Sequence, residues 1–186
     1  MPRRKTTITI LTLGHSNRTL EEFLEILRAH EVERVVDVRT IPRSRHNPQF
    51  DRETLPAQLR GAGIAYTHLK TLGGLRHAKK DSENLGWRNA SFRGFADYMQ
   101  TEEFEAGLAR LLELASGNRC AIMCAEAVPW RCHRSLIADA LTARRVRVEH
   151  IMSKTRRDEH SLTPFASVRG RHINYPAPLF ASSAEH

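Results

Sequence analysis

The sequence predicts an α/β protein with three layers: a mainly parallel sheet of five strands, covered by helices on both faces in a Rossmann-like arrangement. Short apolar runs, which are typical of buried strands, alternate five times with amphipathic segments that are typical of helices. The chain has 186 residues, of which 40% are hydrophobic, so it can form a full core and is not disordered. This length favours one domain over two.

The predicted strands are short runs of β-branched and other apolar residues. The first run stops at Gly14, where the chain turns. Strands of a parallel sheet are covered on both faces, so they read as continuous apolar runs rather than as an alternating pattern. The predicted strands cover residues 7–13, 35–38, 65–69, 120–125 and 146–151.

The predicted helices lie between these strands. Thr19-Leu-Glu-Glu22 matches a capping box, in which the first and fourth residues bond each other's backbone at a helix start. Pro56 lies near the start of a second helix, because proline is tolerated in a first turn and disfavoured deeper in a helix. The helices are therefore expected to begin after Thr19, near Thr54, near Phe95 with a restart at Thr101, and near Leu136.

Two segments lack a clear period. Residues 70–94 alternate glycine with basic residues, and a loop of this length is usually functional or mobile. Beyond His160 the chain is predicted to be loop-like, with a frayed end at 182–186. The sequence thus predicts a single α/β domain over 1–186, with a core at about 6–165 and an irregular tail at 166–186.

The net charge and the cysteine content indicate which binding partners and which cellular compartment to expect. The formal net charge of +8 favours an anionic small molecule or nucleic acid as partner, although scattered charges also fit a merely solvated surface. Three cysteines at no regular spacing favour reduced thiols and a cytoplasmic location. No apolar run approaches 18 residues, so no membrane partner is expected.

The stretch Cys124–Arg134 carries two thiols, a carboxylate, an imidazole and two guanidinium groups within eleven residues. It directly follows a predicted strand, and ligands of α/β proteins bind beyond the carboxyl ends of strands. If the first and fourth strands are neighbours, the stretches 14–16 and 37–39 lie along the same rim. The candidate catalytic residues are Cys132, Cys124, Glu126, His15 and His133, and the candidate anion-binding residues are Ser16, Asp37, Arg39, Arg131 and Arg134.

The preferred chemistry is a cysteine nucleophile in a hydrolase or transferase that acts on a phosphorylated or nucleic-acid-related substrate. Cys132 is expected at a helix amino terminus, where backbone N–H groups and the helix dipole favour a thiolate. His133 adds positive charge nearby, and Glu126 and His15 are the expected proton carriers. A phosphatase loop that pairs cysteine with arginine is approached but not met, because Trp130 stands where that arginine would be and Arg131 comes one residue late, so this type of enzyme is disfavoured.

Several alternatives stay open for these residues. Cys124 and Cys120 can be small hydrophobic residues of a buried strand. No cofactor is predicted; if a metal is bound, Cys124, Cys132 and His133 are its ligands, although no C-x-x-C motif occurs. The basic rim can also serve a nucleic-acid-binding module without catalysis. The Asp37 and Arg39 side chains can form a structural ion pair below the rim, and His150 and His160 can approach the same rim.

The ordered set of short motifs resembles the prokaryotic family catalogued as domain of unknown function 488. The resemblance implies a small cytoplasmic α/β protein with no established activity, so it supports the site and leaves the reaction open. The motifs are Leu13-Gly14-His15-Ser16, Asp37-Val-Arg39 with Pro42 and Ser44, Leu72-Gly73-Gly74, Cys124-x-Glu126-x-x-Pro129-x-x-Cys132-His133-Arg134, His150-Ile151 and His160-Ser-Leu-Thr163.

Overall fold

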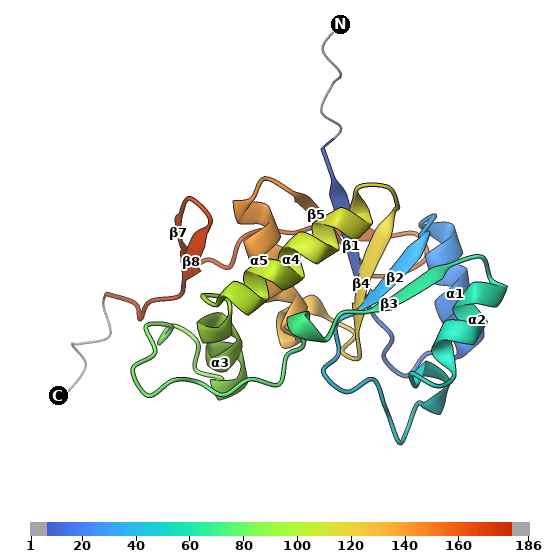
Figure 1. Ribbon diagram of the computed structural model, residues 1–186, viewed down its shortest axis with the longest axis horizontal. Helices are drawn as coiled ribbons and strands as arrows, with labels where there is room; N and C mark the ends of the chain where they lie inside the picture. Colours follow the sequence, from blue (N-terminus) through green and yellow to red (C-terminus); the bar gives the residue numbers. More distant parts are fainter. Residues whose placement is uncertain (1–6, 180–186) are drawn as a thin grey trace, which may run out of the picture.

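The structure is a computed structural model that describes residues 7–179. Its main sheet has six strands in the order β3-β2-β4-β1-β5-β6, and β7 and β8 form a separate hairpin (Figure 1). The strands are β1 (Thr9–Gly14), β2 (Arg34–Asp37), β3 (Ala65–His68), β4 (Cys120–Cys124), β5 (Arg147–Ile151), β6 (Arg157–Glu159), β7 (Ser167–Arg169) and β8 (His172–Asn174). The helices are α1 (Leu20–Ala29), α2 (Leu55–Gly61), α3 (Ala90–Tyr98), α4 (Glu102–Ala115) and α5 (Arg134–Ala143), with short 3-10 turns η1 (Pro48–Phe50), η2 (Lys70–Leu72) and η3 (Pro129–Arg131).

The predicted α/β architecture is confirmed, and all five predicted strands are parallel neighbours in the sheet. The capping box is present at Thr19, and the long helix does restart after Thr101. The strand count was wrong, because β6 adds a sixth, antiparallel strand beside β5. Its sequence, Arg157-Asp-Glu159, has no apolar residue, as suits a short, charged edge strand, and therefore gives no strand signal.

The prediction of a loop-like chain beyond His160 was also wrong. Residues 167–174 form the β7–β8 hairpin, and Tyr175, which follows it, is fully buried. The Tyr175 hydroxyl donates a hydrogen bond of 2.7 Å to Asp139 in α5. The segment assigned to a tail thus covers α5 and contributes to the core, while the predicted fraying at 182–186 lies outside the described residues.

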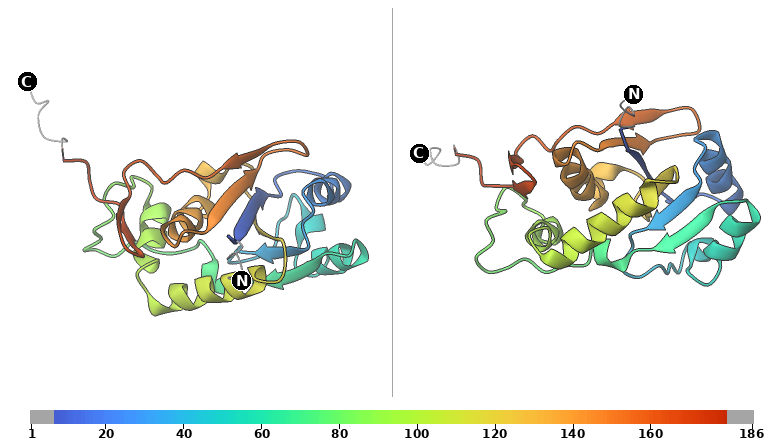
Figure 2. Two further views of the ribbon diagram at one scale, coloured as in Figure 1. Left: turned by 90° about the horizontal axis from the view of Figure 1, so that it is seen from above. Right: turned by 45° about the horizontal axis from the view of Figure 1, so that its top comes forward.

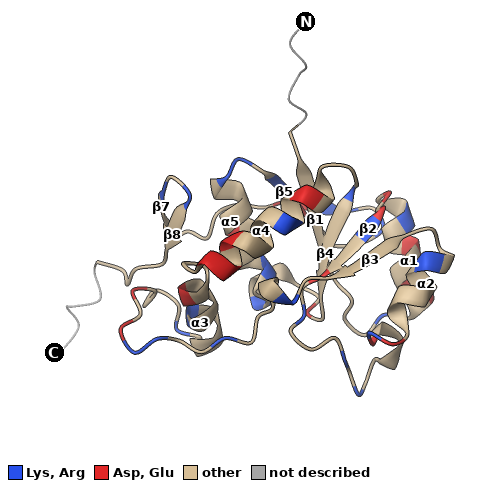
Figure 3. Ribbon diagram, in the orientation of Figure 1, with Lys and Arg blue, Asp and Glu red and all other residues tan. Residues whose placement is uncertain are grey.

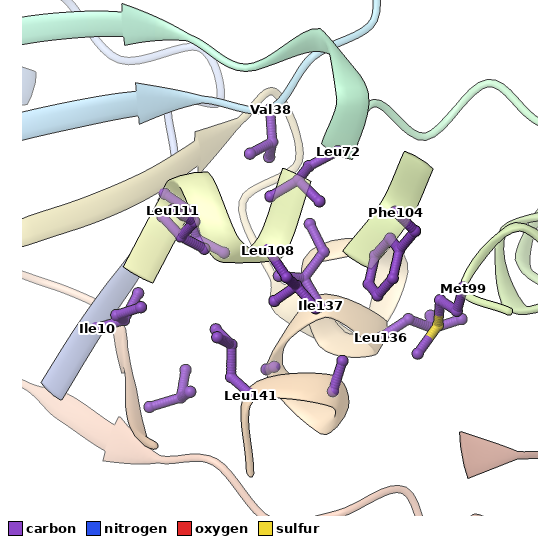
Figure 4. Close-up of a cluster of buried hydrophobic side chains, with 14 of the residues drawn as sticks. Ile10, Val38, Leu72, Met99, Phe104, Leu108, Leu111, Leu136, Ile137 and Leu141 are labelled. Carbon is purple, nitrogen blue, oxygen red and sulfur yellow. The ribbon is translucent and has the colours of Figure 1, made fainter. Parts of the chain in front are cut away.

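Two separate hydrophobic cores lie on the two faces of the sheet, with helices on both sides (Figure 2). Alternate residues of each strand face opposite cores, so Leu11 packs with α1 and α2 while Ile10 packs with α4 and α5. Figure 4 shows the second of these cores, where Leu108 and Leu111 of α4 meet Ile137 and Leu141 of α5. Both faces are therefore closed to solvent, as a parallel sheet requires.

The strand order creates one position where the connections diverge. From β1 the chain crosses to β2 through α1 on one face, whereas from β4 it crosses to β5 through α5 on the other face. The strands β1 and β4 are neighbours, with Gly14 in register with Cys124. The loops after these two strands separate at this point, and such a divergence is where α/β sheets form binding crevices.

Within residues 7–179, no helix combines the length and the apolar character that crossing a bilayer requires.

Candidate active site

A cavity of about 550 Å³ opens at the carboxyl edge of the sheet, at the divergence of β1 and β4. Seven of the ten predicted site residues line it, and several of the loops at this edge carry Lys and Arg (Figure 3). The lining residues are His15, Arg39, Thr40, Ile41, Arg43, Ser44, Gly74, Leu75, Asn89, Ser91, Phe92, Cys124, Ala125, Glu126, Arg131, Cys132 and His133.

Two thiols line the cavity. The Cys124 and Cys132 sulfur atoms are 2.7 Å apart, and both residues are buried except toward the cavity. Cys124 is the last residue of β4, and Cys132 follows the turn η3 directly before α5. The backbone N–H of Arg134, the first residue of α5, points at the Cys132 sulfur at 3.5 Å. The predicted position of Cys132 at a helix amino terminus is confirmed.

His133 contacts the Cys132 thiol through a defined ring nitrogen. Its Nε2 lies 3.0 Å from the Val38 carbonyl oxygen, which can only accept, so Nε2 carries a proton. Its Nδ1 lies 3.5 Å from the Cys132 sulfur, so it can take up the thiol proton and, once protonated, donate a hydrogen bond to the resulting thiolate. Gly74 packs against this ring, because a Cβ there would lie 2.6 Å from Nδ1. The backbone thus fixes both the tautomer and the orientation of the imidazole.

The surroundings of the two thiols shift their pKa values in opposite directions. Burial opposes ionisation of Cys132, but the hydrogen bonds from Cys124 and His133, with the charges of His133 and Arg134, outweigh it and hold its pKa well below the ordinary value. For Cys124, burial and the hydrogen bond to Cys132 raise the pKa well above that value. These opposite shifts favour Cys132 as the thiol that ionises and Cys124 as the thiol that stays protonated and donates to it.

Arg39 supplies fixed positive charge to the cavity wall. Its Nε and Nη2 atoms donate to both carboxylate oxygens of Asp37, at 2.9 and 2.7 Å, and Nη2 also donates to the Phe50 carbonyl. The Tyr66 hydroxyl donates to the same carboxylate at 2.6 Å. Asp37 is fully buried and does not line the cavity, so it serves as the structural partner that holds Arg39. Nη1 is the end of the guanidinium that is not bound to Asp37.

His15 faces the cavity as a neutral imidazole. Its Nδ1 donates to the Ser16 carbonyl at 2.7 Å, which leaves Nε2 unprotonated, 3.4 Å from Arg39 Nη1. Burial, together with the positive charge of Arg39, lowers the pKa of His15 to about 4 despite the Ser16 contact. Ser16 itself does not line the cavity and has a φ of 52°, in the left-handed region. A non-glycine residue there marks a constrained turn beside the site.

Charged side chains surround the mouth of the cavity. Glu126 and Arg131, both predicted, are exposed there, and Arg43 adds a further exposed basic group. Arg134 is different: it is 1% exposed and lies behind the loop instead of in the cavity. It donates to Thr12 Oγ1 at 3.0 Å and to the Glu126 carbonyl at 2.7 Å. Arg134 therefore holds the shape of the loop that carries the two thiols.

His150 and His160 do not reach this cavity. They line a second cavity of about 500 Å³, together with Trp130 of η3. A chain of hydrogen bonds joins both imidazoles to Arg134 through Thr12, and its four links are Arg134 to Thr12 (3.0 Å), Thr12 to His150 (2.6 Å), His150 to His160 (2.8 Å) and His160 to Asp139 (2.7 Å). The C-terminal motif of the sequence thus supports the thiol loop from behind.

We expect Gly74→Ala to disturb the thiol pair indirectly, by displacing the His133 ring that contacts Cys132. The new methyl group would overlap the His133 ring, so the imidazole must move from Cys132, at a cost of about 1–3 kcal/mol in the free energy of unfolding. The control is Gly61→Ala, where no atom lies within 4 Å and the expected effect is neutral or slightly stabilising. Chemical denaturation measures both variants, and equal stabilities would contradict this account of Gly74.

Among residues 7–179 the structure shows no group of three or more His, Cys, Asp or Glu side chains arranged to hold a metal ion. Residues 19–141 match the family model described as "Domain of unknown function DUF488", and this match covers more than half of the chain. No curated protein and no solved structure matches the chain.

Proposed function

The chain belongs to the DUF488 family, whose description assigns no activity, and from its site we propose an enzyme that uses Cys132 as a nucleophile on a small anionic substrate. The observation that carries this proposal is the environment of the Cys132 sulfur. Three groups converge on it: the Cys124 thiol, the His133 imidazole and the first backbone N–H of α5. A buried cysteine that only fills space needs no such set of donors.

The chemistry that these groups support begins with a proton transfer. The Cys132 thiol gives its proton to His133 Nδ1, and the thiolate then attacks the electrophilic atom of the substrate. As the bond to sulfur forms, the bond to the leaving group breaks, and the leaving group takes a proton from His133 or from Glu126 at the mouth. A water molecule or an acceptor then displaces sulfur, with His15 Nε2 as an unprotonated base in the same cavity.

The charges in the cavity support an anionic substrate, of the phosphorylated or nucleotide-derived class. Arg39 is held by Asp37 against the wall, and Arg43 and Arg131 lie at the mouth. Guanidinium groups bind phosphate and carboxylate oxygens in pairs of hydrogen bonds. The proposal also places the protein in a reducing cytoplasm, because its three cysteines are free thiols.

A nucleic-acid-binding module is the second candidate, and exposed groups near the rim favour it. Trp130 is 63% exposed and is followed in the chain by the exposed Arg131. Aromatic and basic side chains together bind single strands by stacking on bases and by contacting phosphates. This candidate makes no use of the buried thiol pair, and for that reason we rank it second.

The anion-binding part of the proposal predicts a preference for a charged alkylating reagent. Iodoacetate carries a carboxylate and iodoacetamide does not, so the ratio of their rates at Cys132 reports how the cavity treats an anion. In Arg131→Gln we expect this ratio to fall about two- to fivefold, because one positive charge near the reagent is lost. The iodoacetamide rate itself should stay unchanged, since Arg131 does not contact the thiols.

The matched control is Arg110→Gln, which removes an exposed arginine that pairs with Glu113 on α4 and should leave the ratio unchanged. An equal ratio in the wild type and in Arg131→Gln would contradict an anion site at the mouth. Salt-dependent binding of a single-stranded oligonucleotide that Cys132→Ser retains in full, with ordinary Cys132 reactivity, would favour the second candidate.

A further inference from the structure

We propose that Cys124 and Cys132 form a reversible disulfide, and that through it the protein reduces a small anionic disulfide bound in the cavity. The inference rests on the proposed nucleophilic role of Cys132 and adds a second thiol to it. The 2.7 Å separation of the two sulfur atoms carries the argument. A disulfide bond is about 2.05 Å long, so the two sulfurs need to approach by less than about 1 Å.

The backbone around Cys124 and Cys132 is held in place by contacts that do not involve the thiols. Cys124 is fixed by the sheet, where it pairs with Gly14 of β1. On the other side of the loop, the Cys132 N–H donates to the Pro129 carbonyl at 3.0 Å. Arg134 holds the carbonyl of Glu126 between them. The seven residues that separate the cysteines are therefore already folded back on themselves, and closing the bond requires no rearrangement of the loop.

The two thiols differ in how readily they ionise, and this difference assigns Cys132 to the first attack and Cys124 to the second. The Cys132 thiolate attacks one sulfur of the bound disulfide RSSR, a Cys132–S–R bond forms, and one thiolate RS⁻ leaves. Cys124 then loses its proton to the second departing thiolate as its sulfur attacks the Cys132 sulfur. The products are the Cys124–Cys132 disulfide, the first RS⁻ and one RSH, so RSSR gains the two electrons that the protein thiol pair loses.

The third cysteine provides an internal comparison. Cys120 lies on the same strand as Cys124, four residues upstream, and is fully buried. At about 3.3 Å per residue the two lie about 13 Å apart, which is too far for a bond. Cys120 also does not line the cavity. It should therefore stay a thiol while the other two react, and Cys120→Ala is the matched control variant.

The experiment treats the reduced full-length protein with glutathione disulfide, an anionic small disulfide, and follows the products by mass spectrometry of the intact chain and of its peptides. In the wild type we expect a loss of two hydrogens and a crosslink between Cys124 and Cys132. Cys124→Ser and Cys124→Ala should instead accumulate the mixed disulfide on Cys132, with a lifetime about tenfold longer or more, because the resolving thiol is gone. Cys132→Ser should give neither product, and Cys120→Ala should behave as the wild type.

Iodoacetamide labelling of the same samples separates this inference from the proposed function. If Cys132 is labelled as a thiolate but glutathione disulfide yields no internal crosslink, the reductase activity is overturned and the nucleophile stands. If Cys132 is labelled only as an ordinary thiol and no crosslink forms, both proposals fail. A stable mixed disulfide in the wild type, or a crosslink that involves Cys120, also overturns the inference. Circular dichroism of each variant confirms that it is folded before it is compared.

Discussion

Cys132 is expected to react with iodoacetamide as a thiolate at pH values well below the ordinary cysteine pKa of about 8.5. The hydrogen bonds from Cys124 and His133 hold its pKa well below the usual value, against the opposing effect of burial. The rate should therefore stay nearly constant as the pH falls through 8.5 and decline only well below it, whereas an ordinary thiol loses about tenfold per pH unit below its pKa. Rates resolved by peptide mass spectrometry over this pH range make the measurement.

Two substitutions of the neighbouring thiol test the cause of this reactivity. Cys124→Ala removes the donor at 2.7 Å from the Cys132 sulfur, and we expect the midpoint of the pH profile to rise by about one unit, the effect of one charge-assisted hydrogen bond. Cys124→Ser keeps a hydroxyl donor and should shift the midpoint less. A midpoint near 8.5 in the wild type, or equal midpoints in all three proteins, would contradict the assignment of Cys132 as the activated thiol.

The sequence predicts the location of the site because a single strand order decides it. Once β1 and β4 are neighbours, Gly14 and Cys124 end side by side, and the following residues, His15 and Glu126, must share one edge. The sequence also indicates the chemistry of these residues, since binding and catalytic residues concentrate on the loops that follow strands. The α/β fold and the place of this cavity were therefore predictable from one periodic pattern and one dense motif.

The interpretation of Arg134 shows what a sequence leaves open. As one of two arginines in the motif, it was expected to bind an anion, yet it is 1% exposed and donates to Thr12 and to the Glu126 carbonyl. Its partners lie 122 and eight residues away. The spacing of residues along the sequence does not reveal contacts that form only when distant strands pack together. Likewise, the hydrogen-bond chain that ends at Asp139 depends on the β5–β6 pairing, which the charged sequence of β6 concealed.

The free energy of unfolding should fall steeply when the pH is lowered from about 6.5 to about 4, because two imidazoles are neutral in the folded protein. Burial, with the charge of Arg39, lowers the pKa of His15 to about 4, and burial, with His160 and Arg134, lowers the pKa of His150 to about 3. In the unfolded chain both titrate near the ordinary value of about 6.5. Between these values the unfolded state binds more protons, so acid favours unfolding.

Each of the two imidazoles contributes up to about 1.4 kcal/mol per pH unit to the slope of the free energy of unfolding against pH. Together they remove a few kcal/mol of stability across this window and none above about pH 7.5. Urea denaturation at a series of pH values measures the slope. His15→Gln should reduce it by about one proton, whereas His46→Gln, at an exposed position, should leave it unchanged. The comparison between variants cancels the carboxylates, which also titrate in acid. An unchanged slope in a folded His15→Gln protein would show that His15 is charged in the native state, and it would then act in the cavity as an anion-binding cation in place of a base.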